Sequence, residues 1–69
     1  MNTSNIRYIV IFDRLYMGTE KITFYLKRIH SYSKNQYQNT IILEEAFKYK
    51  LESSALKASL LVGGRIKII

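Results

Sequence analysis

Cysteine, proline and tryptophan are absent from this sequence, and its single histidine is His30. Without cysteine no disulfide can form, and one histidine is too few for the usual ligand set of a structural zinc site. A chain of 69 residues buries only about 60% of its unfolded surface, so its stability has to come from packing alone. We predict a single α+β domain spanning residues 1–69 that gains further stability from a partner.

Long apolar runs are also missing. No stretch approaches the roughly 20 apolar residues that span a bilayer, and no secretory signal pattern opens the chain. The lack of cysteine fits a reducing compartment. We therefore predict a soluble, cytoplasmic protein with no membrane partner.

Acidic residues are scarce relative to basic ones. Five Asp and Glu stand against eleven Lys and Arg, which gives a formal net charge of +6. A strongly basic small protein is typical of chains that bind nucleic acid or an acidic protein. Charge alone does not choose between these two partners.

The N-terminal part of the chain predicts a buried strand followed by a helix. β-Branched and aromatic residues run from Asn5 to Phe12 and are apolar on both faces, as in a central strand. Asp13–Gly18 is predicted to be a loop, with Thr19 as the N-cap of a helix over Glu20–Ser33, where apolar residues recur at helical spacing. A strand over Ile22–Leu26 is the alternative, because Thr, Phe and Tyr also favour strands.

The second half predicts two or three more strands and a second helix after a polar connector. The ranges are a strand at Thr40–Leu43, a strand or turn to about Tyr49, a helix ending near Val62 before Gly63-Gly64, and a strand at Arg65–Ile69. Residues 44–50 fit both a helical and a strand pattern, and this choice stays open. The order of elements predicts an α+β, ferredoxin-like (split βαβ) sandwich of about four strands and two helices.

One arc of the first predicted helix carries cations around an aromatic ring. In such a pattern phosphates contact the basic rim while a sugar or base lies on the ring. The predicted nucleic-acid-binding residues are Lys21, Phe24, Lys27, Arg28 and Lys34. A surplus apolar surface on the later helix predicts a homodimer that forms through Tyr49, Leu56 and Leu60.

Motifs of catalysis are missing. No Gly-rich phosphate loop, nucleophile elbow or zinc-ligand spacing occurs, so we expect a binding protein without catalytic residues or a cofactor. Asp13 carries the one chemical alternative, because two copies facing each other across a dimer axis could hold Mg²⁺ and act as a nuclease. The simpler interpretation is an Asp that ends a strand and starts a turn.

Two families resemble parts of the chain. The run from Tyr8 to Asp13, the helix expected after it, the run from Gln38 to Ile42 that starts 25 positions after Asp13, and the run from Arg65 to Ile69 resemble CRISPR adaptation protein two. This resemblance implies a ferredoxin-like homodimer that scaffolds the CRISPR integrase and grips duplex DNA, which favours DNA over RNA as the partner. It also matches Asp13 to a metal position whose nuclease role varies in the family.

The other resemblance covers residues 38–69 alone. A strand that starts Gln38-Asn39-Thr40, a helix, and then Gly63-Gly64-Arg65-Ile66 resemble the small basic linker domain of phycobilisomes. This resemblance implies a structural protein that lies among acidic pigment proteins. It explains the same positive charge with a protein partner in place of nucleic acid.

Overall fold

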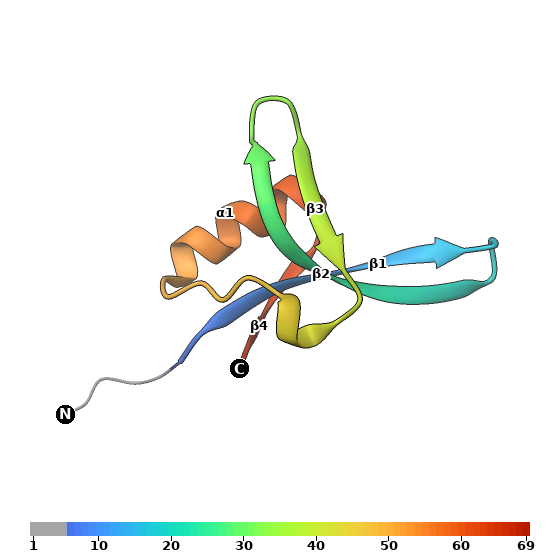
Figure 1. The fold of residues 1–69 in the computed structure, drawn as a ribbon, viewed down its shortest axis with the longest axis horizontal. Helices are drawn as coiled ribbons and strands as arrows, with labels where there is room; N and C mark the ends of the chain where they lie inside the picture. Colours follow the sequence, from blue (N-terminus) through green and yellow to red (C-terminus); the bar gives the residue numbers. More distant parts are fainter. Residues whose placement is uncertain (1–5) are drawn as a thin grey trace.

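The computed structural model describes residues 6–69, which form an antiparallel sheet and one α-helix (Figure 1). The elements are β1 (Tyr8–Tyr16), β2 (Glu20–Ser31), β3 (Gln36–Thr40), a 3₁₀ turn η1 (Leu43–Glu45), α1 (Glu52–Val62) and β4 (Arg65–Ile68). The predicted α+β class with four strands is confirmed. The prediction of two helices is wrong, and with the order β, β, β, α, β the ferredoxin-like plan is not confirmed.

The four strands lie in the order β3-β2-β1-β4 and all pairs are antiparallel. β1, β2 and β3 follow one another as two hairpins, and β4 returns beside β1 after α1. β1 is therefore a central strand, as its sequence predicts. The strand continues past the expected end at Phe12, because pairing with β2 extends to Tyr16. The expected start at Asn5 lies outside the described residues.

The two faces of β1 pack against different parts of the chain. Val10 and Phe12 belong to the main core cluster on the side of α1. Ile9 and Ile11 alternate with them and form a second cluster with Ala46 on the opposite side. Both apolar faces of the strand are thus used, which is why its sequence lacks a simple polar alternation.

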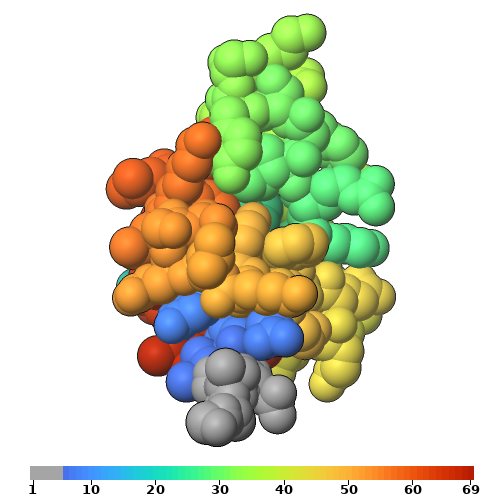
Figure 2. Space-filling model, turned by 90° about the vertical axis from the view of Figure 1, so that its left-hand side faces the viewer, coloured from blue at the N-terminus to red at the C-terminus, as the bar shows by residue number. Residues whose placement is uncertain are grey.

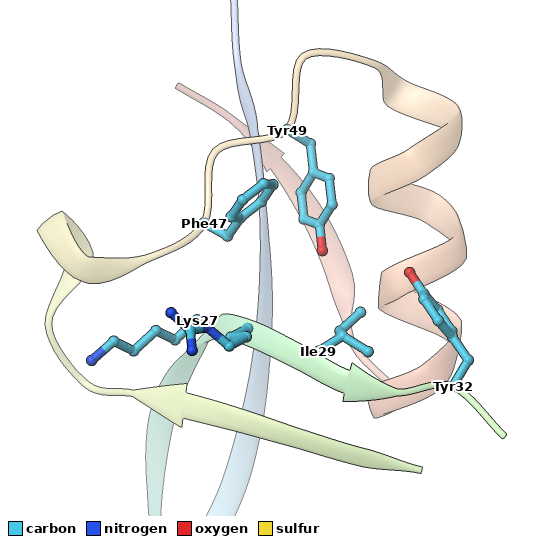
Figure 3. Close-up of a pocket in the computed structure, with 6 residues that line it drawn as sticks. Lys27, Ile29, Tyr32, Phe47 and Tyr49 are labelled. Atoms are coloured by element: carbon cyan, nitrogen blue, oxygen red, sulfur yellow. The ribbon is translucent and has the colours of Figure 1, made fainter. Parts of the chain in front are cut away.

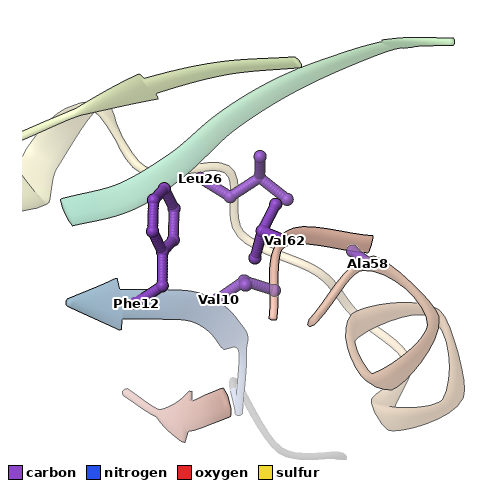
Figure 4. Packing of buried hydrophobic residues seen from close by; sticks show 5 residues of the cluster. All are labelled: Val10, Phe12, Leu26, Ala58 and Val62. Carbon is purple, nitrogen blue, oxygen red and sulfur yellow. The ribbon is translucent and has the colours of Figure 1, made fainter. Parts of the chain in front are cut away.

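The main core joins β1 and β2 to α1. Its buried members are Val10, Phe12, Leu26, Ala58 and Val62 (Figure 4). Phe12 stacks on Phe24 of β2, with ring centroids 5.8 Å apart, and meets Tyr37 of β3 edge-on at 6.1 Å. These contacts hold three strands against one face of a helix that is only eleven residues long.

The helix that the sequence predicts over Glu20–Ser33 is wrong, because this segment is the long strand β2. The register of β2 against β3 shifts between Leu26 and Arg28 and again between Ile29 and Ser31. The first irregularity lies between Leu26 and Ile29, so these two residues, three positions apart, both pack in the main cluster. The shifted strand therefore imitates the 3-to-4-residue spacing of an amphipathic helix.

The predicted loop at Asp13–Gly18 is also wrong in its first four residues, which continue β1. Asp13 pairs with Thr23 in the middle of the β1–β2 hairpin. Thr19 is not an N-cap, since its backbone N–H donates to the carbonyl of Tyr16 and closes the hairpin turn.

The second half is partly as expected. α1 ends at Val62, and Gly63 adopts the left-handed conformation at φ 71° that stops a helix, so the predicted helix end and the strand after it are confirmed. The strand expected at Thr40–Leu43 is wrong, because β3 ends at Thr40. Residues 44–50 form neither a continuous strand nor a continuous helix. Residues 44 and 45 complete η1, and the chain then runs extended to a single bridge between Tyr49 and Tyr8.

Candidate functional site

A groove opens where β2 separates from β1. The pairing of these strands runs from the hairpin turn as far as Ile11 and Tyr25. Beyond this point residues 46–50 insert between them: the Phe47 N–H donates to the carbonyl of Leu26 at 3.0 Å, and Tyr49 exchanges two backbone hydrogen bonds with Tyr8 at 2.9 and 2.8 Å. The inserted segment keeps the two strands apart and forms one wall of the groove.

The groove has a volume of about 350 Å³ and a mixed lining (Figure 3). It is lined by Lys27, Arg28, Ile29, Tyr32, Phe47 and Tyr49. In Figure 3 the rings of Phe47 and Tyr49 lie side by side above β2, and Tyr32 extends toward α1 from the turn that follows β2. The site therefore combines an apolar, aromatic wall with two cations on its rim.

The aromatic wall is firmly placed. Phe47 and Tyr49 meet edge to face with centroids 4.6 Å apart, and Lys57 of α1 holds its ammonium 4.8 Å from the ring centre of Tyr32. Burial raises the pKa of Tyr49 above its ordinary value of 10.0. Phe47 remains 50% exposed, which leaves its ring free to contact a partner.

The two rim cations differ in their surroundings. Lys27 lies 3.6 Å from a carboxylate oxygen of Glu45, which also accepts a hydrogen bond from Thr40. Arg28 has no ion pair or side-chain hydrogen bond within residues 6–69. The guanidinium of Arg28 is thus available to bind an anionic group.

The five residues that the sequence predicts as a nucleic-acid face do not share one surface. Lys27 and Arg28 lie at the groove, but Lys21 lies opposite Leu15 near the first hairpin turn, and Lys34 lies in the second turn. Phe24 packs against the main core instead of facing solvent. The predicted cluster depended on the helix, and it is dispersed because the extended strand β2 carries Lys21 to one of its ends while Lys34 follows the other end.

Sequence reasoning misses the aromatic wall. It leaves Phe47 in a segment that fits both a strand and a helix, and it places Tyr49 in a dimer surface and Tyr32 among the apolar residues of the helix over Glu20–Ser33. The signal that the sequence does contain is the density of aromatic residues at 47 and 49 next to cations. Their place beside Lys27 and Arg28 depends on backbone bonds to β2 and β1, which no local pattern contains.

Asp13 lies in a separate polar cluster on the exposed part of the hairpin. Its carboxylate accepts a hydrogen bond from the Thr23 hydroxyl at 2.9 Å and lies 3.4 Å from the Arg65 guanidinium. Residues 6–69 contain no group of three His, Cys, Asp or Glu side chains that could surround a metal ion. Arg65 already provides positive charge beside this carboxylate, which weakens its attraction for Mg²⁺. The dimeric metal site stays a prediction.

We expect Asp13 to titrate below the ordinary value of 3.8, because the hydrogen bond from Thr23 and then the charge of Arg65 lower its pKa. A lowered folded-state pKa means that the stabilisation is present above the unfolded-state pKa and is lost as pH falls through the folded-state value. Carbon NMR of the carboxyl group measures this directly. Thr23→Val should raise the Asp13 pKa, and an unchanged value would show that Thr23 is not the main cause.

The three residues predicted to form the dimer surface do not lie together. Leu56 and Leu60 remain 48% and 83% exposed on α1, whereas Tyr49 is engaged in the groove and with the main core. Figure 2 shows α1 and the segment before it covering one side of the molecule. The apolar stripe of Leu56 and Leu60 is thus the part of the predicted dimer surface that remains available.

We expect Leu60→Lys to convert a dimer into a monomer with little effect on folding, because the side chain is exposed and surface changes usually stay within about 0.5 kcal/mol. Sedimentation velocity at tens of micromolar measures the first effect and thermal unfolding the second. A wild-type chain that sediments as a monomer would remove the dimer prediction.

Many large apolar side chains are exposed in the described part of the chain. Fourteen large ones are exposed within residues 6–69, against nine buried apolar residues in the core. Singly exposed apolar residues are normal on the surface of a folded protein.

No family model, curated protein or solved structure matches this chain. Within residues 6–69 no helix has the length and apolar content needed to cross a membrane.

Proposed function

We propose that this chain is a small basic linker protein that binds acidic proteins and holds them together in an assembly. The observation that carries the proposal is the groove, where Lys27 and Arg28 flank the exposed ring of Phe47. Protein interfaces combine aromatic contacts with a charged rim, and Arg is enriched in them. An interface for nucleic acid would be more polar and more uniformly cationic than this surface.

The order of elements in the second half supports the same proposal. Asn39 and Thr40 end β3, α1 follows, and Gly63-Gly64 leads into β4. The helix and the strand after Gly63-Gly64 agree with the resemblance to the small linker of phycobilisomes, whereas that resemblance has a strand start at Gln38 and β3 ends at Thr40. The resemblance to CRISPR adaptation protein two implies a helix where the chain has β2, so the integrase scaffold stays a prediction with less support.

Nucleic acid is the second candidate partner, and one observation favours it. The unpaired guanidinium of Arg28 lies in the same groove as the ring of Phe47, so a phosphate and a base could bind side by side. In that case affinity should fall steeply with salt, and removing one cation that binds a phosphate should reduce the slope of log affinity against log salt by roughly one.

The decisive experiment compares two probes at physiological salt, a purified acidic pigment protein of phycobilisomes and a duplex DNA, by isothermal titration calorimetry. We expect binding to the acidic protein and a loss of about tenfold or more in Arg28→Glu, because charge reversal places like charges opposite each other. Lys67→Glu is the matched control: it changes the net charge equally but lies on β4, which β1 separates from β2 and the groove.

The outcomes separate the two candidates. An equal loss in both variants would mean that total charge, and not the groove, determines binding. Tight, salt-dependent binding to DNA together with none to the acidic protein would overturn the linker proposal and favour the nucleic-acid scaffold.

A further inference from the structure

The groove is polar at both ends and apolar between them. Lys27 and Arg28 are consecutive on β2, whereas Tyr32 follows the last residue of that strand. In Figure 3 the hydroxyl groups of Tyr32 and Tyr49 both lie over Ile29, on the side away from Lys27. Ile29 thus forms an apolar floor between a cationic end and an end that carries two phenol groups.

The cationic end offers one free positive charge. The ammonium of Lys27 lies 3.6 Å from a carboxylate oxygen of Glu45, and the Thr40 hydroxyl donates a hydrogen bond to the same oxygen at 2.9 Å. Glu45 therefore already balances Lys27. Arg28 makes no ion pair and no side-chain hydrogen bond in the described part of the chain. This end thus matches a single carboxylate, because a second one would compete with Glu45 for Lys27.

The phenol groups at the other end are free to bind a partner. Neither Tyr32 nor Tyr49 uses its hydroxyl in a hydrogen bond to another of residues 6–69. Lys57 holds its ammonium 4.8 Å from the centre of the Tyr32 ring and is not one of the residues that line the groove. A phenol hydroxyl both donates and accepts hydrogen bonds, so this end suits a backbone amide.

The size of the groove limits what enters it. Its volume of about 350 Å³ is near the lower end of the range of roughly 300–1,000 Å³ for ligand pockets. The rings of Phe47 and Tyr49, with centroids 4.6 Å apart, offer an aromatic wall to whatever lies on Ile29. The groove therefore suits one apolar side chain together with the short extended chain that carries it.

We propose that the groove recognises an extended segment of the acidic partner in which one carboxylate lies next to one apolar side chain. The carboxylate pairs with Arg28, and the apolar side chain lies between Phe47 and Ile29. The hydroxyls of Tyr32 and Tyr49 bind the backbone amide that follows. A run of acidic residues binds less tightly, because it cannot use the apolar floor. This inference rests on the linker function proposed above and names what its groove recognises.

The first test measures the affinity of the full chain for three blocked peptides of equal length by isothermal titration calorimetry at physiological salt. One peptide has a single Asp next to a Phe, the second has Asn in place of that Asp, and the third consists of Glu alone. We expect the Asp–Phe peptide to bind about tenfold more tightly than either of the others, because it alone offers both a carboxylate and an apolar side chain. Equal or tighter binding of the Glu peptide would overturn the inference.

Tyr32→Phe tests the other end of the groove. The substitution removes one hydroxyl and keeps the ring that Lys57 contacts, so the melting temperature should stay unchanged. Affinity for the Asp–Phe peptide and for the purified phycobilisome pigment protein should fall about threefold, the loss of one hydrogen bond. Tyr16→Phe is the matched control: it removes a hydroxyl from an exposed side chain at the turn of the β1–β2 hairpin, and it should bind as the wild type does.

The outcomes distinguish this inference from the linker proposal. If Arg28→Glu weakens binding to the pigment protein while Tyr32→Phe does not, the inference is overturned and the linker proposal stands. A wild type that binds the Asp–Phe peptide and not the pigment protein would support the chemistry of the groove and overturn the linker proposal. If the wild type binds neither, both fail.

Discussion

Gly64→Ala should remove a large share of the stability of the fold. A Cβ at this position would overlap the carbonyl oxygen of Ile11 and lie 3.0 Å from the Cβ of Phe12. Both neighbours belong to the central strand β1, so the new methyl group can be accommodated only by moving β4 away from β1. We expect a loss of about 3 kcal/mol, at the upper end for overpacking. The total stability of a chain this short is only roughly 3–10 kcal/mol.

Gly63→Ala provides the matched control one residue earlier. Gly63 has φ 71°, but no atom lies within 4 Å of a Cβ built there. The cost is therefore limited to the left-handed backbone conformation, about 1 kcal/mol. Urea unfolding followed by circular dichroism measures both variants. Equal losses would show that the close approach of Gly64 to β1 is not important.

Phe12→Ala should lose about 3–5 kcal/mol of stability, the largest effect of a single truncation that we expect in this chain. Phe12 is 2% exposed, and its ring contacts both Phe24 and Tyr37. Removing the ring therefore leaves a cavity at the centre of three strands. Thermal unfolding should show a weak or missing cooperative transition.

Phe47→Ala removes a phenyl ring from the wall of the groove. It should reduce binding more than it reduces stability. Since Phe47 is half exposed, we expect a loss of only about 1 kcal/mol in stability. Affinity for the acidic pigment protein should fall several-fold, because the aromatic wall is the apolar part of the proposed interface. Unchanged affinity in a folded Phe47→Ala variant would contradict the role of the groove.

Parts of the candidate site can be predicted from the sequence and parts cannot. Lys27 and Arg28 are predicted as binding residues because a cationic surface is visible in composition and spacing. Their aromatic partners are not, because Phe47 and Tyr49 reach the groove through backbone bonds to β2 and β1. These bonds connect residues about 20 and 40 positions apart, and local periodicity carries no information about such pairs.

The sequence by itself determined the features that depend on local chemistry. The β-branched run around Val10 makes a central strand, and Gly63 ends α1 since a residue without Cβ takes the left-handed position readily. The excess of Lys and Arg sets the charge of the surface in any fold. The tertiary structure decided the rest. β2 is a strand because pairing with β1 and β3 satisfies its backbone, and a register shift between Leu26 and Ile29 places both on one side although they are three residues apart.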